Sequence, residues 1–372
     1  MAKKQEQESA RSEVIEVAPN VLRMELPIHM PGLGHVNMYA LIDGEGAAVV
    51  DPGLPGPLSW RAIKDRLKRA DLRVKHVHTV LVTHSHPDHF GGASRFAKQA
   101  GSEIVAHRHF RFGSFAAAAE PEVSVDDLAA QRADQADDAD GEQTRRVHGK
   151  AAAAEVQASA IQKWRGTTPW GGPHPRPPLH VRMRWQIMRR LGTSFLPTIT
   201  KLVSHGDVLR LAGREWFVVH TPGHTEDHFC LHCPEEGVFL AGDHVLPSIT
   251  PHISGLTRAP DPLNAFFDSL DLVGKIDEVK QVLPAHGHPF QDLRGRAEAI
   301  KRHHYQRLDK VKEIGRELGP SKVEAYSKKL FARRSWGAMA ESETFAHLEH
   351  LLHAGDAERR EDERGVFIYA TG

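Results

Sequence analysis

Three histidines and one aspartate stand within six consecutive positions of this 372-residue chain, at His84, His86, Asp88 and His89. The cluster directly follows the apolar run at residues 77–82, so a buried strand is expected to end just before it. Alternate residues of a strand face the same way, so His84 and His86 can hold one ion. The other two side chains stand on the following turn and can face a second ion. Imidazole and carboxylate without thiolate favour zinc, with iron or manganese as alternatives.

Three further segments repeat this arrangement, in which an apolar run leads into a glycine-containing turn that carries a ligand-type side chain. They are residues 216–225 with His224, residues 237–244 with Asp243, and residues 279–287 with His286. An additional Asp-Pro-Gly turn begins at Asp51, directly after the apolar residues 47–50. These companions argue against the alternative interpretation of the first cluster, a histidine-rich surface loop.

Taken in order, these motifs resemble those of the metallo-β-lactamase-fold hydrolase superfamily, over roughly residues 14–292. The resemblance implies one metal ion held by His84, His86 and His224, a second held by Asp88, His89 and His286, and Asp243 as the bridge between them. It also implies that Asp51 orients ligand groups through hydrogen bonds. No ligand position is altered, which favours two Zn²⁺ per chain over the mononuclear iron variant of the fold.

The resemblance further implies an α/β chain folded as an αββα sandwich, and a hydrolase in which a metal-bridging hydroxide attacks the substrate. Asp88 would help to orient that nucleophile. The turns at His224 and Asp243 most resemble the hydroxyacylglutathione-hydrolase-like group, so the expected substrate is an ester-type bond, above all a thioester. Four alternatives stay open: a phosphodiesterase or ribonuclease, a lactonase or β-lactamase side activity, a mononuclear iron persulfide dioxygenase, and a non-catalytic binding protein.

Several neighbouring residues allow more than one interpretation. His228 occupies a position where relatives often have a pocket-lining histidine, so a catalytic and a structural role are equally consistent with the sequence. His220 is expected to be packed rather than a further ligand. Cys230 and Cys233 lie three apart in a strand-like run, so their side chains should point to opposite faces and form neither a zinc site nor a redox pair.

The chain divides into three parts by composition, the second of which contains an insertion. Residues 1–12 are expected to be a disordered N-terminus, and residues 13–292 a catalytic domain that contains a helical and proline-rich insertion at 110–200. The insertion is expected to form a lid over the site, or alternatively a peripheral or oligomer-forming element. Residues 293–372 have the pattern of three helices and a terminal strand, which resembles the winged-helix-like C-terminal domain of some relatives.

Charge and hydropathy limit the partners. The chain has 48 basic and 48 acidic residues, so nothing attracts it overall to nucleic acid or an anionic membrane. The helix expected near residues 341–353 has no Lys or Arg, which argues against DNA reading. No apolar stretch approaches the roughly 20 residues of a membrane span, and the polar N-terminus does not resemble a signal peptide. We therefore expect a cytoplasmic enzyme with a small-molecule substrate; its oligomeric state stays open.

Overall fold

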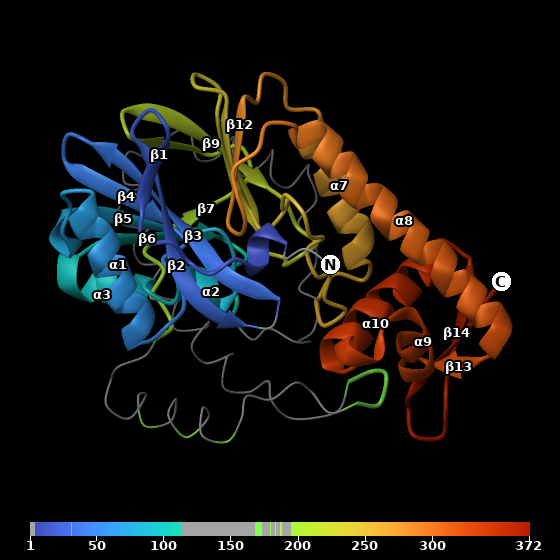
Figure 1. Ribbon diagram of the computed structural model, residues 1–372. Coiled ribbons are helices and arrows are strands. Elements are labelled where there is room, and N and C mark those ends of the chain that lie inside the picture. Colours follow the sequence, from blue (N-terminus) through green and yellow to red (C-terminus); the bar gives the residue numbers. More distant parts are fainter. Residues whose placement is uncertain are drawn as a thin grey trace, which may run out of the picture.

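Two β-sheets packed face to face, with helices on both outer faces, form the framework of the protein (Figure 1). The computed structural model describes residues 4–30, 32–112, 168–172 and 195–372, together with the isolated positions 179, 183 and 187. The predicted α/β class and αββα sandwich are confirmed. The lid predicted for the insertion, and most of the insertion itself, lie outside the described residues.

The first sheet has seven strands that follow one another in sequence order. They are β1 (Val14–Ala18), β2 (Val21–Met30), β3 (Leu33–Asp43), β4 (Gly46–Val50), β5 (Val77–Val82), β6 (Glu103–His107) and β7 (Lys201–Val203). Pairs from β1 to β4 are antiparallel, and pairs from β4 to β7 are parallel. Parallel neighbours need crossover connections. These run through α1 (Pro57–Arg69) and η2 (Val74–His76) before β5, and through α2 (Pro87–Phe90) and α3 (Ala93–Ala100) after it.

The second sheet has five strands in the order β12-β11-β10-β9-β8. They are β8 (Val208–Leu211), β9 (Arg214–His220), β10 (Phe229–Cys233), β11 (Val238–Gly242) and β12 (Gln281–Pro284). All pairs are antiparallel except β11 with β12, whose crossover contains α7 (Pro262–Gly274). The next helix, α8 (Leu293–Leu318), packs beside α7.

Along each strand, alternate side chains pack into separate apolar cores on the two faces of the sheet. On β5, Val80 and Val82 join the core beneath α1 and α3, whereas Leu81 joins the core between the sheets. On β10, Cys230 faces the core beneath α7 and α8, and Cys233 faces the core between the sheets. The two cysteines therefore point to opposite faces, as the sequence predicts, and both are free thiols.

A C-terminal unit continues from α8 (Figure 1). Its elements are β13 (Ser321–Lys322), α9 (Val323–Leu330), η3 (Arg333–Ser335), α10 (Ala338–His353), β14 (Ala357–Glu361) and β15 (Phe367–Thr371). The three strands form one antiparallel sheet in the order β13-β15-β14. The predicted helices and terminal strand are present, while a winged-helix-like identity stays a prediction. Residues of α10 share one apolar core with α7 and α8, so the unit is packed onto the sandwich.

The N-terminal segment is bound to the sandwich from Lys4 onward, so the prediction of disorder over residues 1–12 is wrong for 4–12. Glu6, in η1 (Gln5–Gln7), is fully buried. Its carboxylate accepts hydrogen bonds from the backbone N–H groups of Ser248 at 2.8 Å and Ile249 at 3.1 Å. A buried carboxylate needs such partners. These partners are 242 and 243 positions away, so no local sequence pattern indicates them.

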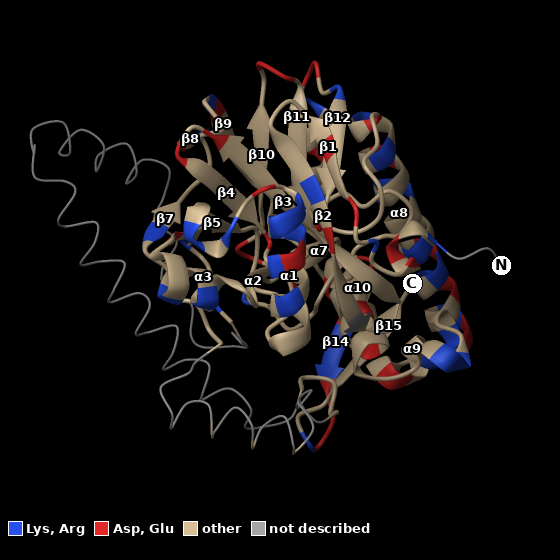
Figure 2. Cartoon of the chain, turned by 60° about the vertical axis from the view of Figure 1, so that its left-hand side comes forward, with Lys and Arg blue, Asp and Glu red and all other residues tan. Residues whose placement is uncertain are grey.

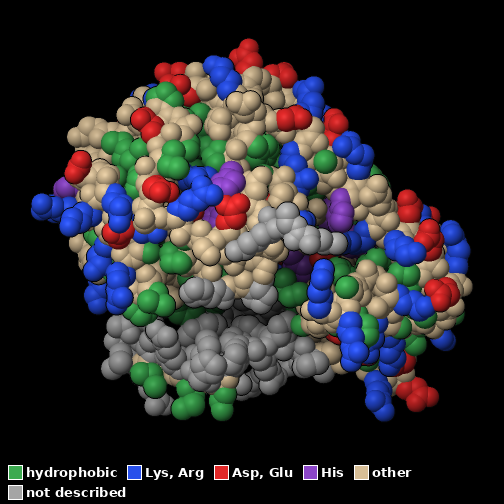
Figure 3. Space-filling view, in the orientation of Figure 1, with side chains coloured by type: hydrophobic (Ala, Val, Ile, Leu, Met, Phe, Trp, Pro, Cys, Tyr) green, Lys and Arg blue, Asp and Glu red, His purple; other side chains and the backbone are tan. Residues whose placement is uncertain are grey.

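Charges of both signs are interspersed over α1, α8 and the C-terminal unit (Figure 2). On one face of the molecule, Lys and Arg side chains are prominent over the C-terminal unit (Figure 3). Among the helices in the described part of the chain, none is long and apolar enough to cross a membrane.

Candidate metal centre

The seven predicted ligand side chains follow the ends of four strands that belong to both sheets. His84, His86, Asp88 and His89 follow β5, while His224, Asp243 and His286 follow β9, β11 and β12 respectively. All are buried except His86, which is half-buried. Because these strands end on the same side of the sandwich, their loops bring together side chains that are as many as 202 positions apart in the sequence.

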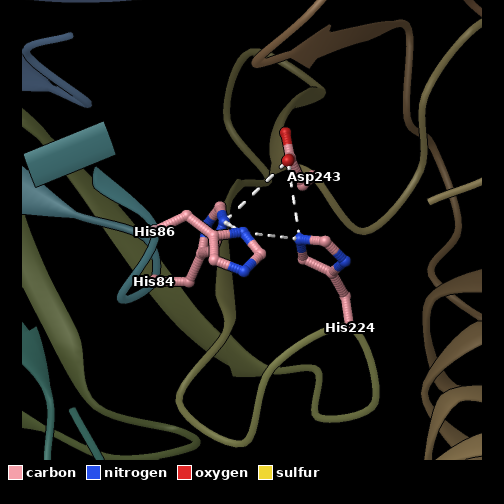
Figure 4. Close-up of side chains that lie close together, drawn as sticks. All are labelled: His84, His86, His224 and Asp243. Carbon is pink, nitrogen blue, oxygen red and sulfur yellow. Dashed lines mark hydrogen bonds and ion pairs between the residues drawn. The ribbon is translucent and has the colours of Figure 1, made fainter. Parts of the chain in front are cut away.

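His84, His86 and His224 form the first donor group (Figure 4). His86 Nδ1 lies 2.9 Å from His84 Nε2 and 3.1 Å from His224 Nε2. Asp243 Oδ2 lies 3.8 Å from His84 Nε2 and 3.6 Å from His224 Nε2. Donor atoms at about 2.0–2.1 Å from a tetrahedral zinc ion are roughly 3.3 Å from one another. The observed separations bracket that value, so one ion fits among these four side chains.

Asp88, His89 and His286 form the second donor group. Asp88 Oδ2 lies 3.6 Å from both His89 Nε2 and His286 Nε2. Asp243 also faces this group, with Oδ2 at 3.5 Å from His89 Nε2 and Oδ1 at 3.4 Å from His286 Nε2. Asp243 therefore stands between the two groups, in the position of a ligand that two ions share.

Three buried polar atoms at this centre have no partner with hydrogen-bond geometry: His89 Nε2, His286 Nε2 and Asp243 Oδ1. A buried polar atom without a partner costs about 1–3 kcal/mol. Divalent cations would supply the missing partner to all three atoms at once. The donor set of imidazoles and carboxylates, together with these orphaned atoms, fits two such ions.

The protein environment favours neutral imidazoles in the first donor group. Burial lowers the pKa of His84 and of His86 well below the ordinary value, and it also lowers the pKa of His224. Neutral imidazoles offer the lone pairs that metal ions require. In the second donor group burial opposes the charge of His89, but Asp243, Asp51 and Asp88 hold its pKa well above the ordinary value. The carboxylates thus attract positive charge most strongly to the second group.

Asp51 supports the second donor group from behind. Its carboxylate accepts a hydrogen bond from His89 Nδ1 at 2.9 Å, and two more from the backbone N–H and the hydroxyl of Thr83 at 2.9 and 2.7 Å. Asp51 adopts a left-handed backbone conformation with φ 54°, a sparsely populated region for a non-glycine residue. The surrounding hydrogen bonds compensate for this strain.

Backbone carbonyls hold two other ligand rings. His286 Nδ1 donates to the carbonyl of His35, and His224 Nδ1 donates to the carbonyl of His252, both at 2.7 Å. Asn37 Nδ2 donates to the carbonyl of Gly287 at 2.9 Å and so fixes the turn after His286. Bonds of this kind set the rotation of a ring and leave its Nε2 directed at the centre.

Glycines allow the ligand turns to pass close to other parts of the chain. Gly223 has φ 133°, and a Cβ there would lie 2.5 Å from the Cα of Phe266. Gly242 has φ 51°, and a Cβ there would lie 2.5 Å from His228 Nε2. Glycine is required at both positions because a side chain would be strained and would also clash.

His228 lies behind the centre and is fully buried. Its Nδ1 lies 2.7 Å from Thr221 Oγ1, and its Nε2 accepts a hydrogen bond from the backbone N–H of Asp243 at 3.0 Å. Both ring nitrogens are occupied, so the structure favours the structural role over the pocket-lining role that the sequence left open. His228 fixes the backbone of the shared ligand.

Other histidines near the ligands are engaged elsewhere. His220 stacks on His107, with ring centroids 3.9 Å apart and planes at 13°. The two rings are packed face to face, and His220 Nε2 also lies 2.8 Å from the carbonyl oxygen of Glu226. His288 Nε2 lies 3.2 Å from a carboxylate oxygen of Glu8. The buried ring of His244 packs edge-on against Phe266, with ring centroids 5.2 Å apart.

Four supporting residues were not predicted from the sequence: Thr83, His35, Asn37 and His252. Thr83 stands between β5 and the first ligand, so its position was a usable signal. The other three act on ligands that follow different strands, and Asn37, for example, is 250 positions from the carbonyl it holds. No local sequence pattern indicates such contacts.

A family model of the metallo-beta-lactamase superfamily matches residues 31–286, a range that includes all the predicted ligands. The chain belongs to the metallo-β-lactamase superfamily. Members of this superfamily are metal-dependent hydrolases, so the predicted enzyme class is confirmed.

Solved structures extend the similarity beyond the sandwich. A metallo-beta-lactamase family protein from Thermus thermophilus superposes with a TM-score of 0.70 at 27% identity, covering 96% of this chain and 100% of its own. A beta-lactamase domain protein from Burkholderia ambifaria superposes with a TM-score of 0.68 at 25% identity, covering 98% of this chain and 95% of its own. Coverage this high includes the C-terminal unit.

Similarity to curated proteins is weaker or more local. Probable metallo-hydrolase YqjP of Bacillus subtilis is 24% identical over 343 residues, which cover 87% of this chain and 90% of the relative. Lactamase-like protein nscB of Aspergillus fumigatus is 32% identical over 114 residues, so the match spans only 32% of that relative's length and 31% of this chain.

Two further local matches have names that state a reaction. Hydroxyacylglutathione hydrolase of Rhizobium meliloti is 44% identical over 73 residues, covering 17% of this chain and 28% of the relative. Atrochrysone carboxyl ACP thioesterase of Aspergillus fumigatus is 30% identical over 118 residues, covering 32% and 26%.

Proposed function

We propose that this chain is a dinuclear zinc hydrolase that cleaves an ester-type bond, with a thioester as the favoured substrate. The observation that carries the proposal is the pair of donor groups that share Asp243, with every donor in place and three of their atoms buried without a partner. In this proposal the first donor group holds one ion, the second holds the other, and Asp243 contacts both.

Zinc ions held in this way lower the pKa of bound water toward about 7 and polarise a substrate carbonyl. The chain itself keeps the donors in place. Asp51 and the carbonyl of His35 fix the rings of the second donor group, the carbonyl of His252 fixes His224, and His228 holds the backbone of Asp243. In this proposal Asp88 is both a donor and the carboxylate that orients the attacking water.

The side chains leave no place for a cysteine nucleophile. Cys230 and Cys233 are both fully buried in the apolar cores. Burial raises the pKa of the Cys230 thiol to about 12, so it is not a thiolate at neutral pH. Neither cysteine is therefore suited to act as the nucleophile, which is consistent with the proposed attack by activated water.

The names of two relatives support a thioester as the substrate. One is an ACP thioesterase, and the other a hydroxyacylglutathione hydrolase. A hydroxyacyl group joined to the thiol of glutathione is itself a thioester. Both matches cover less than a third of the relative, so they support the class of bond and leave the identity of the acyl group and the thiol open.

The test combines metal content with a panel of substrates. Protein purified without added metal is assayed for metal per chain and for turnover of a thioester, a lactone, a cephalosporin and a phosphodiester. Asp88→Ala is compared with Asp277→Ala, which removes an exposed carboxylate whose side chain is 84% accessible. We expect about two zinc ions per chain, as in other two-metal hydrolases, and thioester turnover that only Asp88→Ala abolishes.

Other outcomes would overturn specific parts of the proposal. Turnover of the phosphodiester alone would replace the thioester with the phosphodiesterase alternative. One iron per chain with no hydrolysis would contradict the dinuclear centre and favour an oxygenase. Turnover that Asp88→Ala leaves unchanged would remove the donor groups from the reaction.

A further inference from the structure

The first turns of α10 are in close contact with the loop that supports His224. This loop comprises residues 251–258, and it lies between β11 and α7. Ser342 Oγ accepts a hydrogen bond from the backbone N–H of Gly255 at 3.0 Å. A Cβ on Gly255 would lie 2.5 Å from the ring of Phe345 and 2.7 Å from the carbonyl of Ser342. The loop therefore touches the C-terminal unit too closely for any residue larger than glycine at this position.

Glu343 makes the contact that leads to the metal centre. One of its carboxylate oxygens lies 3.2 Å from His252 Nδ1, and the other is paired with Arg307 on α8. The carbonyl of His252, in turn, accepts the hydrogen bond from His224 Nδ1. Glu343 of the C-terminal unit is thus separated from a ligand of the first donor group by a single residue.

The same loop braces the ligand turn at a second point. Glu226, two residues after His224, accepts hydrogen bonds from the hydroxyl of Thr257 at 2.6 Å and from the backbone N–H of Arg258. Any movement of the loop would therefore move the turn that carries His224. This bracing makes the position of the loop, and hence its attachment to α10, relevant to metal binding.

His304 and His347 lie beside Glu343, and together these side chains resemble a further cation site. However, the guanidinium of Arg307 already pairs with Glu343, and His304 Nδ1 lies 3.1 Å from His347 Nε2. The positive charge of Arg307 therefore already occupies the carboxylate that a cation would need. The cluster is a buried hydrogen-bonded network. It is connected to the metal centre through the contact between Glu343 and His252.

The supports of the second donor group come from other parts of the chain. Asp51 directly follows β4 and His35 lies within β3, so both are positioned by strands of the seven-stranded sheet. Hydrogen bonds to the Nδ1 atoms of His89, His286 and His224 are described above. Of these three rings, His224 is the one held by a loop that contacts the C-terminal unit.

We propose that Glu343 is a positioning residue, which holds His252 and, through its carbonyl, the orientation of His224. The C-terminal unit thereby sets the affinity of the first donor group for its metal ion and leaves the second donor group unaffected. This inference rests on the metal centre of the proposed function, and it does not depend on which substrate is cleaved.

The test measures zinc affinity by competition with a chromogenic chelator, in the full-length chain. Glu343→Ala is compared with Glu349→Ala, which removes another buried glutamate of α10. Glu349 pairs with Arg359 and contacts Tyr369 inside the C-terminal unit, and so serves as the matched control. We expect Glu343→Ala to weaken the binding of one of the two zinc ions by about 10- to 100-fold, the usual effect of losing a supporting contact. The control should leave both affinities within roughly twofold.

Two more variants separate positioning from a loss of folding. Glu343→Gln retains an acceptor for His252, so we expect it to restore part of the lost affinity. His252→Ala breaks the same link at a half-buried position of the loop and leaves the pair of Glu343 and Arg307 intact. His252→Ala should weaken binding of the same zinc ion. The double variant Glu343→Ala/His252→Ala should bind that ion no more weakly than the single variants, because both substitutions break the same link.

Each outcome decides the inference. Equal losses in Glu343→Ala and Glu349→Ala, or additive losses in the double variant, would show that the C-terminal unit acts on stability alone. Loss of the second ion rather than the first, identified by the absorption spectrum of the cobalt-substituted protein, would also overturn it. A wild-type chain that binds no zinc would contradict the proposed function itself.

Discussion

The two donor groups share Asp243 but are supported by different regions of the molecule. Rings of the second donor group are held by Asp51, directly after β4, and by the carbonyl of His35 in β3. In the first donor group, His224 is held by a loop that rests on α10 of the C-terminal unit. In the proposed centre, the second metal position is therefore supported from the seven-stranded sheet, whereas the first also depends on a contact with the C-terminal unit.

The largest effect is expected from removing what the groups share. Asp243→Ala takes a donor from both groups and removes the carboxylate oxygens that lie 3.5 Å from His89 Nε2 and 3.4 Å from His286 Nε2. We expect both ions to be lost on dialysis, and hydrolysis to fall by at least about a thousandfold, since metal catalysis contributes several kcal/mol. Metal analysis alongside the rate assay checks this, and a variant that retained two ions would refute the shared-ligand assignment.

A selective effect is expected from Asp51→Asn. Asparagine tolerates the left-handed backbone at this position, so the turn should persist. Its amide, however, cannot match a carboxylate as acceptor for both Thr83 and His89. We expect the second ion to bind about 10- to 100-fold more weakly while the first is retained. Chelator competition measures both, and preferential loss of the first ion would reverse the comparison.

Gly223→Ala should disturb the first donor group in turn. The new Cβ would meet the backbone of Phe266 on α7, and the residue would be strained at φ 133°. We expect a loss of about 1–3 kcal/mol in the free energy of unfolding and weaker binding of the first ion. The matched control is Gly274→Ala, at the end of the same helix, where a Cβ would meet no atom within 4 Å. Urea unfolding compares the two variants, and equal stability would disprove the close approach.

A last effect, of about the same size as that of Gly223→Ala, concerns the acid stability of the contact between the units. Burial alone would raise the pKa of Glu343, but the hydrogen bond from His252 and the charge of Arg307 lower it to about 2 from the ordinary 4.5. A lowered folded-state pKa stabilises the fold above the unfolded-state pKa, and this contribution is lost as the pH falls toward 2. In the metal-free protein, the stability advantage of wild type over Glu343→Gln should shrink by about 2 kcal/mol between pH 6 and pH 3.

Urea titrations at the two pH values measure this difference. An advantage that stays constant with pH would show that the carboxylate of Glu343 is not held ionised by its neighbours.

The sequence predicted those parts of the centre that depend on local order. His84 and Asp243 each follow an apolar strand within a few positions, and strand ends at one edge of a sandwich bring such residues together. The same reasoning predicted the opposite faces of Cys230 and Cys233, because a strand alternates its side chains.

Contacts between distant segments were not predictable in this way. Glu6 docks on residues 242 and 243 positions away, and Glu343 reaches His252 across 91 positions. A buried glutamate in a polar segment has the same sequence signature as an exposed one, since its burial is decided by partners on other elements. For His228 the sequence left two roles open, and only the pair of hydrogen bonds on its ring distinguishes them.

Anomalous diffraction at the zinc absorption edge tests the central claim most directly, on crystals of the protein as purified. We expect two peaks about 3.5–4 Å apart, one among His84, His86 and His224 and the other among Asp88, His89 and His286, with Asp243 contacting both. A single peak, or two peaks of which only one contacts Asp243, would contradict it.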